Sequence, residues 1–541
     1  MSVAEIPVRL GMRAAVELHS LGSAVRAGML GVESPQRTFQ AIQALRRYGV
    51  LGGELSIAAL RHGERTALVD ELGELSFADL DRRSNALANA LRSRGIGEGT
   101  SVAIYCRNHR GFLDATYACA KSGARALYLN TDFAGPQVRD VCERENVEAL
   151  IHDEEFTGMV EGVAAPRGRF LAWTDSEPDV PTLEELIESG DPSPPPAPDG
   201  QSSVVMLTSG TTGTPKGAPR TQPRSLAAVG ALLSKVPFRS EEATYVAAPL
   251  FHALGFAHAA VAMGLGSTLV IKRRFEPQQT LAAVAERRTT ALIVVPVMLQ
   301  RILALGDDEL ARHDTSALRI IFVSGSQLEG DLARRAMDRF GDVVYNLYGS
   351  TEVAWATIGT PEDLRAAPGC AGRPPFGTRV RLYDADGRPA ARGETGRIFV
   401  GNVLPFEGYT GGGTKEIIDG LMSTGDVGHF DEAGRLFVDG RDDEMIVSGG
   451  ENVFPREIEE LLATHEDVEE AAALGVPDEQ YGQRLRVFLV PRRELSEDDV
   501  KSFIRENLAR FKVPREVVFV DELPRNPAGK ILKRQLAEQQ P

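Results

Sequence analysis

The chain has 541 residues, of which 43% are hydrophobic and 25% charged, as in a soluble globular protein too long for a single core. The net charge of −16 argues against the basic face of a nucleic-acid binder, so we predict no nucleic-acid partner. Four cysteines without a CxxC pair, nine histidines without zinc-site spacing and charged residues that interrupt any secretory signal favour a cytoplasmic protein.

Residues 1–50 are predicted to form a helical extension. Apolar residues recur at helical spacing, and a second helical pattern starts at Phe39; the first set is Leu10, Ala14, Leu18, Leu21 and Val25. Packing against the main domain would explain these stripes. Because arginines accompany them, a weak peripheral contact with a membrane surface is a second interpretation.

Residues 51–440 are predicted to form a large domain in which strands and helices alternate. We expect a hairpin at 66–77, a strand at 101–106, a helix ending at Lys121 and strands at 126–130, 292–295, 319–323 and 343–347. Such alternation is typical of an α/β fold with parallel sheet. Shorter strands at 378–383, 396–400 and 435–438 predict a β-rich subdomain after Gly372.

Two segments of this domain need separate interpretation. The proline-rich stretch 192–198 is predicted to be a surface linker. The nearly uncharged stretch 245–271 is long enough to span a bilayer. Its proline, histidine and glycine residues favour instead a strand, a turn, a buried helix and a second strand.

Residues 441–541 are predicted to form a small α+β domain. The pattern indicates helices at 455–464 and 497–509 and strands at 470–474, 485–490 and 517–520. The fold class is therefore α/β, with a large N-terminal domain of α/β subdomains, a β-rich subdomain and a small α+β C-terminal domain.

The segment Thr208–Gly217 has the composition of a phosphate-binding loop. It holds three glycines, five hydroxyl side chains and Lys216, and it follows the apolar run 204–207. Helical spacing resumes at Leu226, so we expect the loop to join a strand to a helix, where backbone N–H groups favour anions. Five residues separate Gly210 from Lys216, which excludes a Walker P-loop. A flexible surface loop is the alternative.

Four later segments combine with this loop. An apolar strand ends in the turn 345–352, which presents Glu352; Ser423–Asp426 and 440–455 follow; and Leu523–Lys530 ends in Gly529 and Lys530. Alone, Glu352, Ser423–Asp426 and Lys530 would each be read as solvated surface features. Together, and in this order over about residues 55–535, they resemble the motifs of the adenylate-forming superfamily, which includes acyl-CoA synthetases, peptide-synthetase adenylation domains and firefly luciferase.

The resemblance implies that ATP, Mg²⁺ and coenzyme A bind. Tyr348 would stack on adenine, Asp426 would bind the ribose, Arg441 would face ribose and phosphate, and Glu352 with Thr208 would hold Mg²⁺. The residues expected to contact these ligands are Thr208, Ser209, Gly210, Thr211, Thr212, Gly213, Thr214, Lys216, Gly325, Ser326, Tyr348, Gly349, Thr351, Asp426, Arg441, Gly449 and Gly450.

The resemblance also implies a mobile C-terminal domain that carries the catalytic Lys530. An ammonium group there would bind the attacking carboxylate and the α-phosphate together and offset their repulsion. The hinge would be Asp443, although the run Asp442-Asp443-Glu444 departs from the family's common form. Ser448 to Asn452, with Gly449 and Gly450, would enter the site for the second half reaction.

The identity of the carboxylic acid is less defined by the sequence. Peptide-synthetase domains place an aspartate where this chain has His252, so an amino acid's ammonium would be buried unpaired, which argues against amino acids. By resemblance to acyl- and aryl-CoA synthetases, His252 would be catalytic, lining the passage for carboxylate and thiol; a purely structural histidine is the alternative.

Small residues in the segments that wall the family's acyl pocket predict a medium- to long-chain fatty acid as substrate. The alternatives are an aryl or short-chain acid, transfer to a carrier protein, a luciferase-like oxygenase, and a nucleotide-binding regulator, which Lys530 argues against. The sequence leaves monomer and homodimer open.

Overall fold

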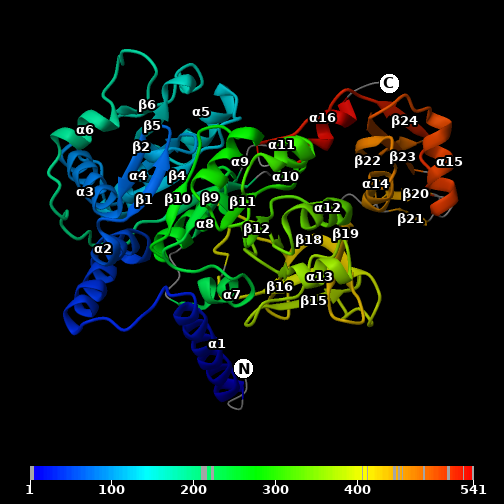
Figure 1. Ribbon diagram of the computed structural model, residues 1–541, viewed down its shortest axis with the longest axis horizontal. Coiled ribbons are helices and arrows are strands. Elements are labelled where there is room, and N and C mark those ends of the chain that lie inside the picture. The colour runs from blue at the N-terminus through cyan, green and yellow to red at the C-terminus, as the bar shows by residue number, and fades with distance from the viewer. Residues whose placement is uncertain are drawn as a thin grey trace.

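The computed structural model describes residues 5–208, 216–220, 225–404, 406–410, 412–442, 446–448, 451–453, 455–478, 482–508, 512–527 and 529–538. Two α/β sheets and a β-rich subdomain make up a large body, and a smaller α+β unit at the carboxyl end lies to one side of it (Figure 1). The predicted fold class is confirmed.

The first sheet has six strands in the order β6-β5-β3-β4-β7-β8, all parallel except β8, which runs antiparallel to β7. Its strands are β3 (Ser101–Tyr105), β4 (Arg125–Tyr128), β5 (Ala149–Asp153), β6 (Arg169–Trp173), β7 (Val204–Thr208) and β8 (Lys216–Arg220). Its helices are α3 (Phe77–Ser93), α4 (Arg110–Ser122), α5 (Gly135–Arg144) and α6 (Leu183–Ser189), with a 3₁₀ turn at Glu154–Phe156. Strands β3 and β5 are buried at every position, as apolar runs in a parallel sheet should be.

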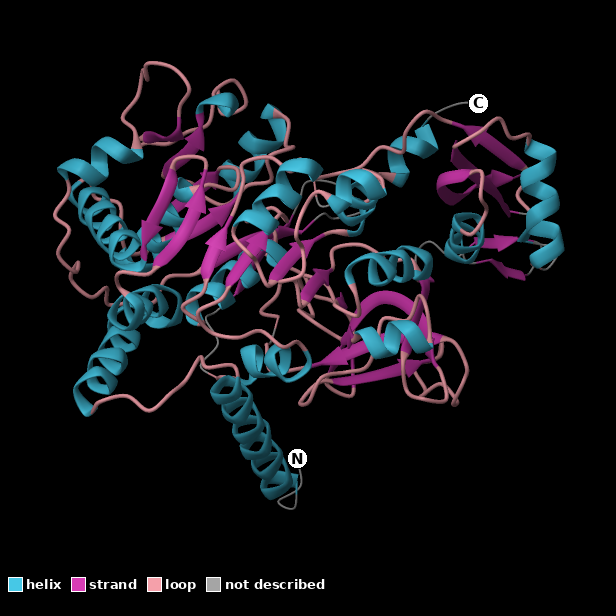
Figure 2. Cartoon of the chain, in the orientation of Figure 1, coloured by secondary structure: helices cyan, strands magenta, loops and turns pink. Residues whose placement is uncertain are grey.

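The second sheet has eight strands in the order β14-β13-β12-β11-β9-β10-β1-β2, with antiparallel strands at its two edges. They are β1 (Thr66–Asp70), β2 (Gly73–Ser76), β9 (Ala243–Val246), β10 (Thr268–Val270), β11 (Ala291–Val294), β12 (Ile320–Val323), β13 (Val344–Tyr348) and β14 (Thr357–Gly359). The accompanying helices are α7 (Ala227–Lys235), α8 (Ala253–Gly264), α9 (Pro277–Glu286), α10 (Pro296–Leu303), α11 (Asp307–Ala311), α12 (Gly330–Phe340) and α13 (Pro361–Ala366). Figure 2 shows strands and helices alternating through this part of the body.

The expectation that the phosphate-type loop leads straight into a helix is wrong. After the loop the chain forms β8, which pairs with β7 from Thr208 opposite Lys216 to Val204 opposite Arg220, and α7 begins only at Ala227. Gly217 permits this pairing because a Cβ there would lie 2.9 Å from Val205 Cγ1 and 2.4 Å from Thr410 Oγ1. The loop therefore lies between two antiparallel partner strands, and the next helix along the chain begins only after β8.

Two other expectations are confirmed. The stretch 245–271 folds as β9, α8 and β10, and among the described residues no helix is both long and apolar enough to cross a bilayer. The proline-rich stretch 192–198 forms neither helix nor strand; the side chains of Arg47 and Tyr48 donate to the carbonyl of Pro195 and hold it against the body.

The β-rich subdomain and the C-terminal unit each have a sheet of five strands. The subdomain contains β15 (Arg379–Tyr383), β16 (Gly396–Gly401), β17 (Ile417–Ile418), β18 (Leu421–Phe430) and β19 (Leu436–Arg441). The C-terminal unit contains β20 (Ile446–Ser448), β21 (Glu451–Val453), β22 (Val468–Asp478), β23 (Gly482–Pro491) and β24 (Glu516–Phe519), with α14 (Pro455–Ala463), α15 (Glu497–Asn507) and α16 (Lys533–Glu538).

The N-terminal extension forms α1 (Glu5–Arg26) and α2 (Pro35–His62), and α2 runs past residue 50 into the body. The expectation that the stripe of α1 packs on the main domain is wrong for its described side chains. Leu18, Leu21 and Val25 are 69%, 43% and 53% exposed, whereas Ser20 and Ala24 are buried. Helix α1 contacts α7 through these small side chains, and Ser20 lies against Gly230.

Candidate active site

A tyrosine, an aspartate and an arginine form the centre of the candidate site. Tyr348 ends β13 at the carboxyl edge of the eight-stranded sheet, and its hydroxyl donates to Asp426 Oδ2 at 2.6 Å. Asp426 and Arg441 are paired residues of β18 and β19, with Arg441 Nη1 3.3 Å from Asp426 Oδ1. Three residues from separate segments of the sequence therefore meet where a sheet edge faces the β-rich subdomain, the position at which α/β sheets bind ligands.

Opposing effects act on the pKa of Asp426. Burial raises its pKa above the ordinary value, while the hydrogen bond from Tyr348 and the charges of Arg441 and Lys530 act in the other direction. The same burial, with Asp426 as neighbour, raises the pKa of Tyr348 well above its ordinary value. Tyr348 is thus a hydrogen-bond donor at neutral pH, and the carboxylate is fixed in orientation.

Glu352 lies in the turn after β13 and is kept ionised. Although burial favours its neutral form, hydrogen bonds from Tyr409 Oη (2.6 Å) and Ser350 Oγ (2.8 Å), with the charge of Lys415, lower its pKa below the ordinary value. A carboxylate has about four lone-pair positions for acceptance, so Glu352 retains capacity for a cation. An ionised oxygen donor beside a phosphate-type loop fits Mg²⁺.

Glycine and a small residue shape the turn that carries Glu352. A Cβ at Gly349 would lie 2.1 Å from the carbonyl oxygen of Ala354, and Ala354 itself has a φ of 61°. A left-handed conformation in a non-glycine residue costs about 1 kcal/mol or more and is often found at functional sites. Thr351 lies in the same turn.

The base of the phosphate-type loop is anchored beside Glu352. The ammonium of Lys216 lies 5.2 Å from the ring centroid of Tyr409, and the N–H of Thr410 donates to Gly217 at 2.9 Å. Tyr409 therefore touches both the loop and Glu352. Ser209, Gly210, Thr211, Thr212, Gly213, Thr214, Gly449 and Gly450 lie outside the described residues, as does the side chain of Thr208.

Lys530 approaches the site from the C-terminal unit. Its charge acts on Asp426, and the preceding Gly529, with a φ of 75°, lies so close to α10 that a Cβ would be 2.6 Å from Val297 Cγ1. Asn526 closes the loop that carries Lys530 through two hydrogen bonds of 2.9 Å. The backbone N–H of Asn526 donates to the carbonyl of Lys530, and Asn526 Oδ1 accepts from the backbone N–H of Lys530. The loop of the predicted catalytic lysine thus lies against the large body, and the charge of Lys530 reaches Asp426.

Sequence reasoning missed two members of this region, Tyr409 and Lys415. A Cβ on Gly425 would lie 3.6 Å from Lys415 Nζ and 3.3 Å from Arg441 Nη2. The two carboxylates, Glu352 and Asp426, therefore lie among four cations, Lys216, Lys415, Arg441 and Lys530, which suits a polyanion such as a nucleoside triphosphate. The usable signal was an aromatic residue and a lysine in the glycine-rich stretch 408–415.

Two further predicted site residues, His252 and Gly325, lie at the ends of other elements. His252 precedes α8, and its ring lies 4.6 Å from that of Phe251, between centroids, at a tilt of 44°. Burial lowers its pKa to about 4, and within the described chain its Nε2 has no hydrogen-bond partner. A neutral imidazole with an unused nitrogen is suited to contact a substrate. Gly325 follows β12, has a φ of 96° and precedes Ser326. On its other side, Ser324 Oγ donates to the carbonyl of Leu347, the residue before Tyr348.

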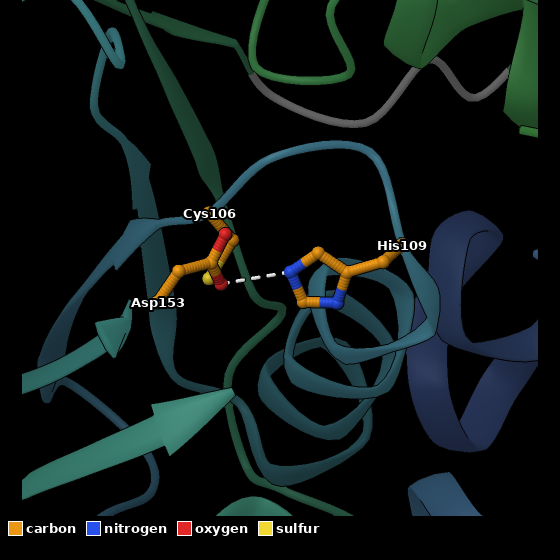
Figure 3. A group of neighbouring side chains, drawn as sticks. All are labelled: Cys106, His109 and Asp153. Carbon is orange, nitrogen blue, oxygen red and sulfur yellow. Dashed lines mark hydrogen bonds and ion pairs between the residues drawn. The ribbon is translucent and has the colours of Figure 1, made fainter. Parts of the chain in front are cut away.

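A second cluster has the composition of a metal site but is closed by its own hydrogen bonds. Cys106, His109 and Asp153 are buried together with ligand atoms within 4.8 Å of one another (Figure 3). His109 Nδ1 accepts from the N–H of Gly111 at 3.1 Å, so Nε2 carries the proton and donates to Asp153 Oδ1 at 2.8 Å. A metal on Nε2 would need that proton removed, so we assign the cluster to the core.

Comparison with known proteins places most of the chain in one family. Residues 55–410 match the family model described as AMP-binding enzyme, and residues 457–530 match its C-terminal domain. The chain belongs to the AMP-binding enzyme family. The Tyr348, Glu352 and Lys216 groups fall inside the first match, and Lys530 ends the second.

Relatives within this family act on several acids. The chain is 35% identical over 484 residues to a feruloyl-CoA synthase from Amycolatopsis sp, covering 88% of this chain and 94% of the relative. It is 30% identical to the fatty acid–[acyl-carrier-protein] ligase ScoC of Streptomyces coeruleorubidus, covering 87% and 93%. The structure resembles the o-succinylbenzoate CoA synthetase of Bacillus subtilis in complex with the acyl-adenylate OSB-AMP, with a TM-score of 0.79, 26% identity and coverage of 90% and 98%.

Proposed function

We propose that the protein is an AMP-forming CoA ligase that activates an aromatic carboxylic acid. The observation that carries the proposal is the Asp426, Tyr348 and Arg441 group, on whose carboxylate the charge of Lys530 acts, in a chain that belongs to the AMP-binding enzyme family. A cation brought by a separate unit to a nucleotide-type site serves a reaction between two anions.

In the first step a carboxylate oxygen of the acid attacks the α-phosphorus of ATP. The bond from that phosphorus to the bridging oxygen breaks, and pyrophosphate leaves with the electron pair. Lys530 would hold the carboxylate and α-phosphate together, and Asp426, Tyr348 and Arg441 would fix the adenosine end. Glu352, with Thr208, would hold Mg²⁺, which when bound offsets phosphate charge.

In the second step the sulfur of CoA attacks the acyl carbon, and the bond to AMP breaks. The thiol proton passes to solvent water as the sulfur attacks, and AMP departs as an anion. His252 is placed in this proposal along the path of carboxylate and thiol, because its buried Nε2 is neutral and available for a hydrogen bond. A hydrogen bond to substrate would give His252 Nε2 the partner that it lacks, and would remove the free-energy cost of burying that nitrogen unpaired.

The proposed substrate class departs from the fatty acid predicted from small pocket residues. Small side chains leave room, but the volume they leave admits a ring as well as an alkyl chain. Feruloyl and succinylbenzoate groups both carry an aromatic ring, and they belong to relatives of high similarity. These names favour the aryl alternative, while the carrier-protein ligase keeps a fatty acid and a carrier as the rival.

Pyrophosphate release across a panel of acids tests the proposal. We expect ferulate or 2-succinylbenzoate to exceed decanoate and palmitate in kcat/KM by at least about tenfold, with acyl-CoA formed only when CoA is added. Lys530→Ala, purified identically, controls for contaminating pyrophosphate release. Preference for palmitate would contradict the aryl assignment. Acyl-AMP that accumulates with CoA but is consumed by an acyl carrier protein would contradict the CoA assignment.

A further inference from the structure

The apolar face of helix α1 points away from the protein. Leu18, Leu21 and Val25 follow one another at helical spacings of three and four residues and are 69%, 43% and 53% exposed. The opposite face, with Ser20, Ser23 and Ala24, is buried. A helix that only packed on the body would bury its large apolar side chains, so this orientation needs another explanation.

The outer half of helix α2 shows the same orientation. Phe39, Ile42 and Leu45 recur every three residues and are 64%, 46% and 40% exposed, and residues 34–40 are exposed throughout. The inner half buries Leu51, Leu55 and Ala58 in the body. Figure 1 shows α1 and the outer part of α2 both reaching away from the sheets at the lower edge of the molecule.

Exposed apolar side chains are concentrated in this segment. Of the thirteen large hydrophobic residues that are exposed in the described chain, eight lie within residues 18–50; they are Leu18, Leu21, Val25, Val32, Phe39, Ile42, Leu45 and Val50. The match to the AMP-binding enzyme family begins at residue 55. The segment therefore lies outside the family match, and the patch forms no part of the adenylation site.

The charge of this segment is opposite to that of the body. Six arginines and three glutamates give residues 1–50 a charge of +3, whereas the chain as a whole carries −16, so residues 51–541 carry −19. Arg13, Arg26, Arg37 and Arg46 are exposed beside the apolar rows. Two glutamates are already bound: Glu17 accepts from Ser225, and Glu33 pairs with Arg61 at 3.0 Å.

We propose that α1 and the outer half of α2 bind an anionic lipid surface. Apolar side chains would enter the boundary between headgroups and acyl chains, and the arginines would contact phosphate groups. A lipid surface supplies both the apolar depth and the negative charge that these rows match. A second copy of the chain fits less well, because symmetric pairing would bring two arginine-flanked rows of like charge together.

Vesicle co-sedimentation with the full chain tests this inference. The vesicles are phosphatidylcholine alone and phosphatidylcholine mixed with phosphatidylglycerol in equal parts. We expect binding to the mixed vesicles only, and a decrease of several-fold at high salt because exposed charges are screened. Leu18→Ser, Phe39→Ser and Ile42→Ser together should reduce the partition coefficient by roughly tenfold or more. Arg13→Gln, Arg37→Gln and Arg46→Gln together should remove the preference for phosphatidylglycerol.

The matched control changes exposed apolar residues elsewhere, at Leu72, Met159 and Phe519, each to Ser. It should bind like the wild type. Failure of the wild type to bind mixed vesicles at low salt, or equal binding by the apolar variant, would overturn the proposal. Sedimentation velocity adds a separate outcome: a dimer that the apolar variant dissociates, without vesicle binding, would assign the patch to a second copy instead.

Discussion

Two polar clusters lie at the carboxyl ends of parallel strands. They differ in how far the hydrogen-bonding groups and charges of each cluster are paired within the cluster itself. The His109 and Asp153 cluster, after β3 and β5, is fully buried, and its nitrogen atoms and carboxylate bond to one another and to backbone groups. The Asp426 cluster, between β13 and the β-rich subdomain, joins residues from three segments and is approached by Lys530.

This contrast shows that residue type and position at a strand end do not by themselves define a site. Cys106, His109 and Asp153 offer better metal ligands than Tyr348, Asp426 and Arg441 do. What separates the two clusters is the excess of charge around the second. Two carboxylates lie among four cations there, whereas the first closes its hydrogen bonds internally.

The largest effect is expected from Lys530→Ala. Loss of the ammonium should lower acyl-AMP formation by on the order of a thousandfold, because charge building during displacement loses its partner. Thioester formation from supplied acyl-AMP should change by less than about threefold. Rapid-quench measurement of both half reactions checks this. Lys501→Ala, on the remote helix α15, is the control, and equal losses in both steps would remove the assigned role.

Asp153→Ala should act on stability alone. Removing the carboxylate leaves the Nε2–H of His109 and the N–H of Arg107 buried without an acceptor, at a cost of about 3 kcal/mol in the free energy of unfolding. Urea denaturation measures the loss. The kcat per folded molecule should stay within about twofold of wild type. A selective fall in kcat would mean that this cluster is functional.

The buried His252 predicts a pH dependence of stability. Its pKa is about 4 in the folded protein and near its ordinary value of 6.5 when unfolded, so the unfolded state binds the proton first as pH falls. The free energy of unfolding should therefore decrease between pH 6.5 and 4, by up to about 3 kcal/mol from this group. Thermal unfolding across this range should show a shallower slope for His252→Gln, and parallel slopes would contradict the burial.

Asp426→Asn should weaken nucleotide binding without unfolding the protein. The amide keeps the size of the side chain but removes the charge facing Arg441, so kcat/KM for ATP should fall by about ten- to a hundredfold. Steady-state kinetics with varied ATP measures this. Asp439→Asn, beside His429 on β19, is the matched control and should leave KM for ATP unchanged.

The smallest effect is expected from removing metal. Because hydrogen bonds already use the atoms of the Cys106 cluster, dialysis against a chelator should shift the melting temperature by less than about 1 °C when ATP is absent. Activity should still require added Mg²⁺. Metal analysis of the purified protein that found zinc in stoichiometric amount would contradict the assignment of the cluster to the core.

The sequence by itself predicted most of the element pattern, and it singled out Tyr348, Asp426 and Arg441, which the structure brings together. Runs such as 101–106 and 291–294 are continuous and apolar, which selects buried strands by local pattern, and Gly123 ended α4 as a left-handed cap. The motifs around Tyr348, Asp426 and Lys530 were recognisable because each combines several specific residue types over a short span.

Tertiary structure decided what local pattern cannot encode. The segment after the phosphate-type loop pairs with β7 because Gly217 fits against Val205 and Thr410, a contact across nearly two hundred residues. Tyr409 and Lys415 join the site only through chain folding. Helix α1 is amphipathic, and its sequence pattern alone does not say which face packs on the body. In the structure the face with small side chains packs on α7, and the large apolar side chains face outward. Helical periodicity predicts that a helix has two different faces, but only three-dimensional packing decides which of them is buried against the body.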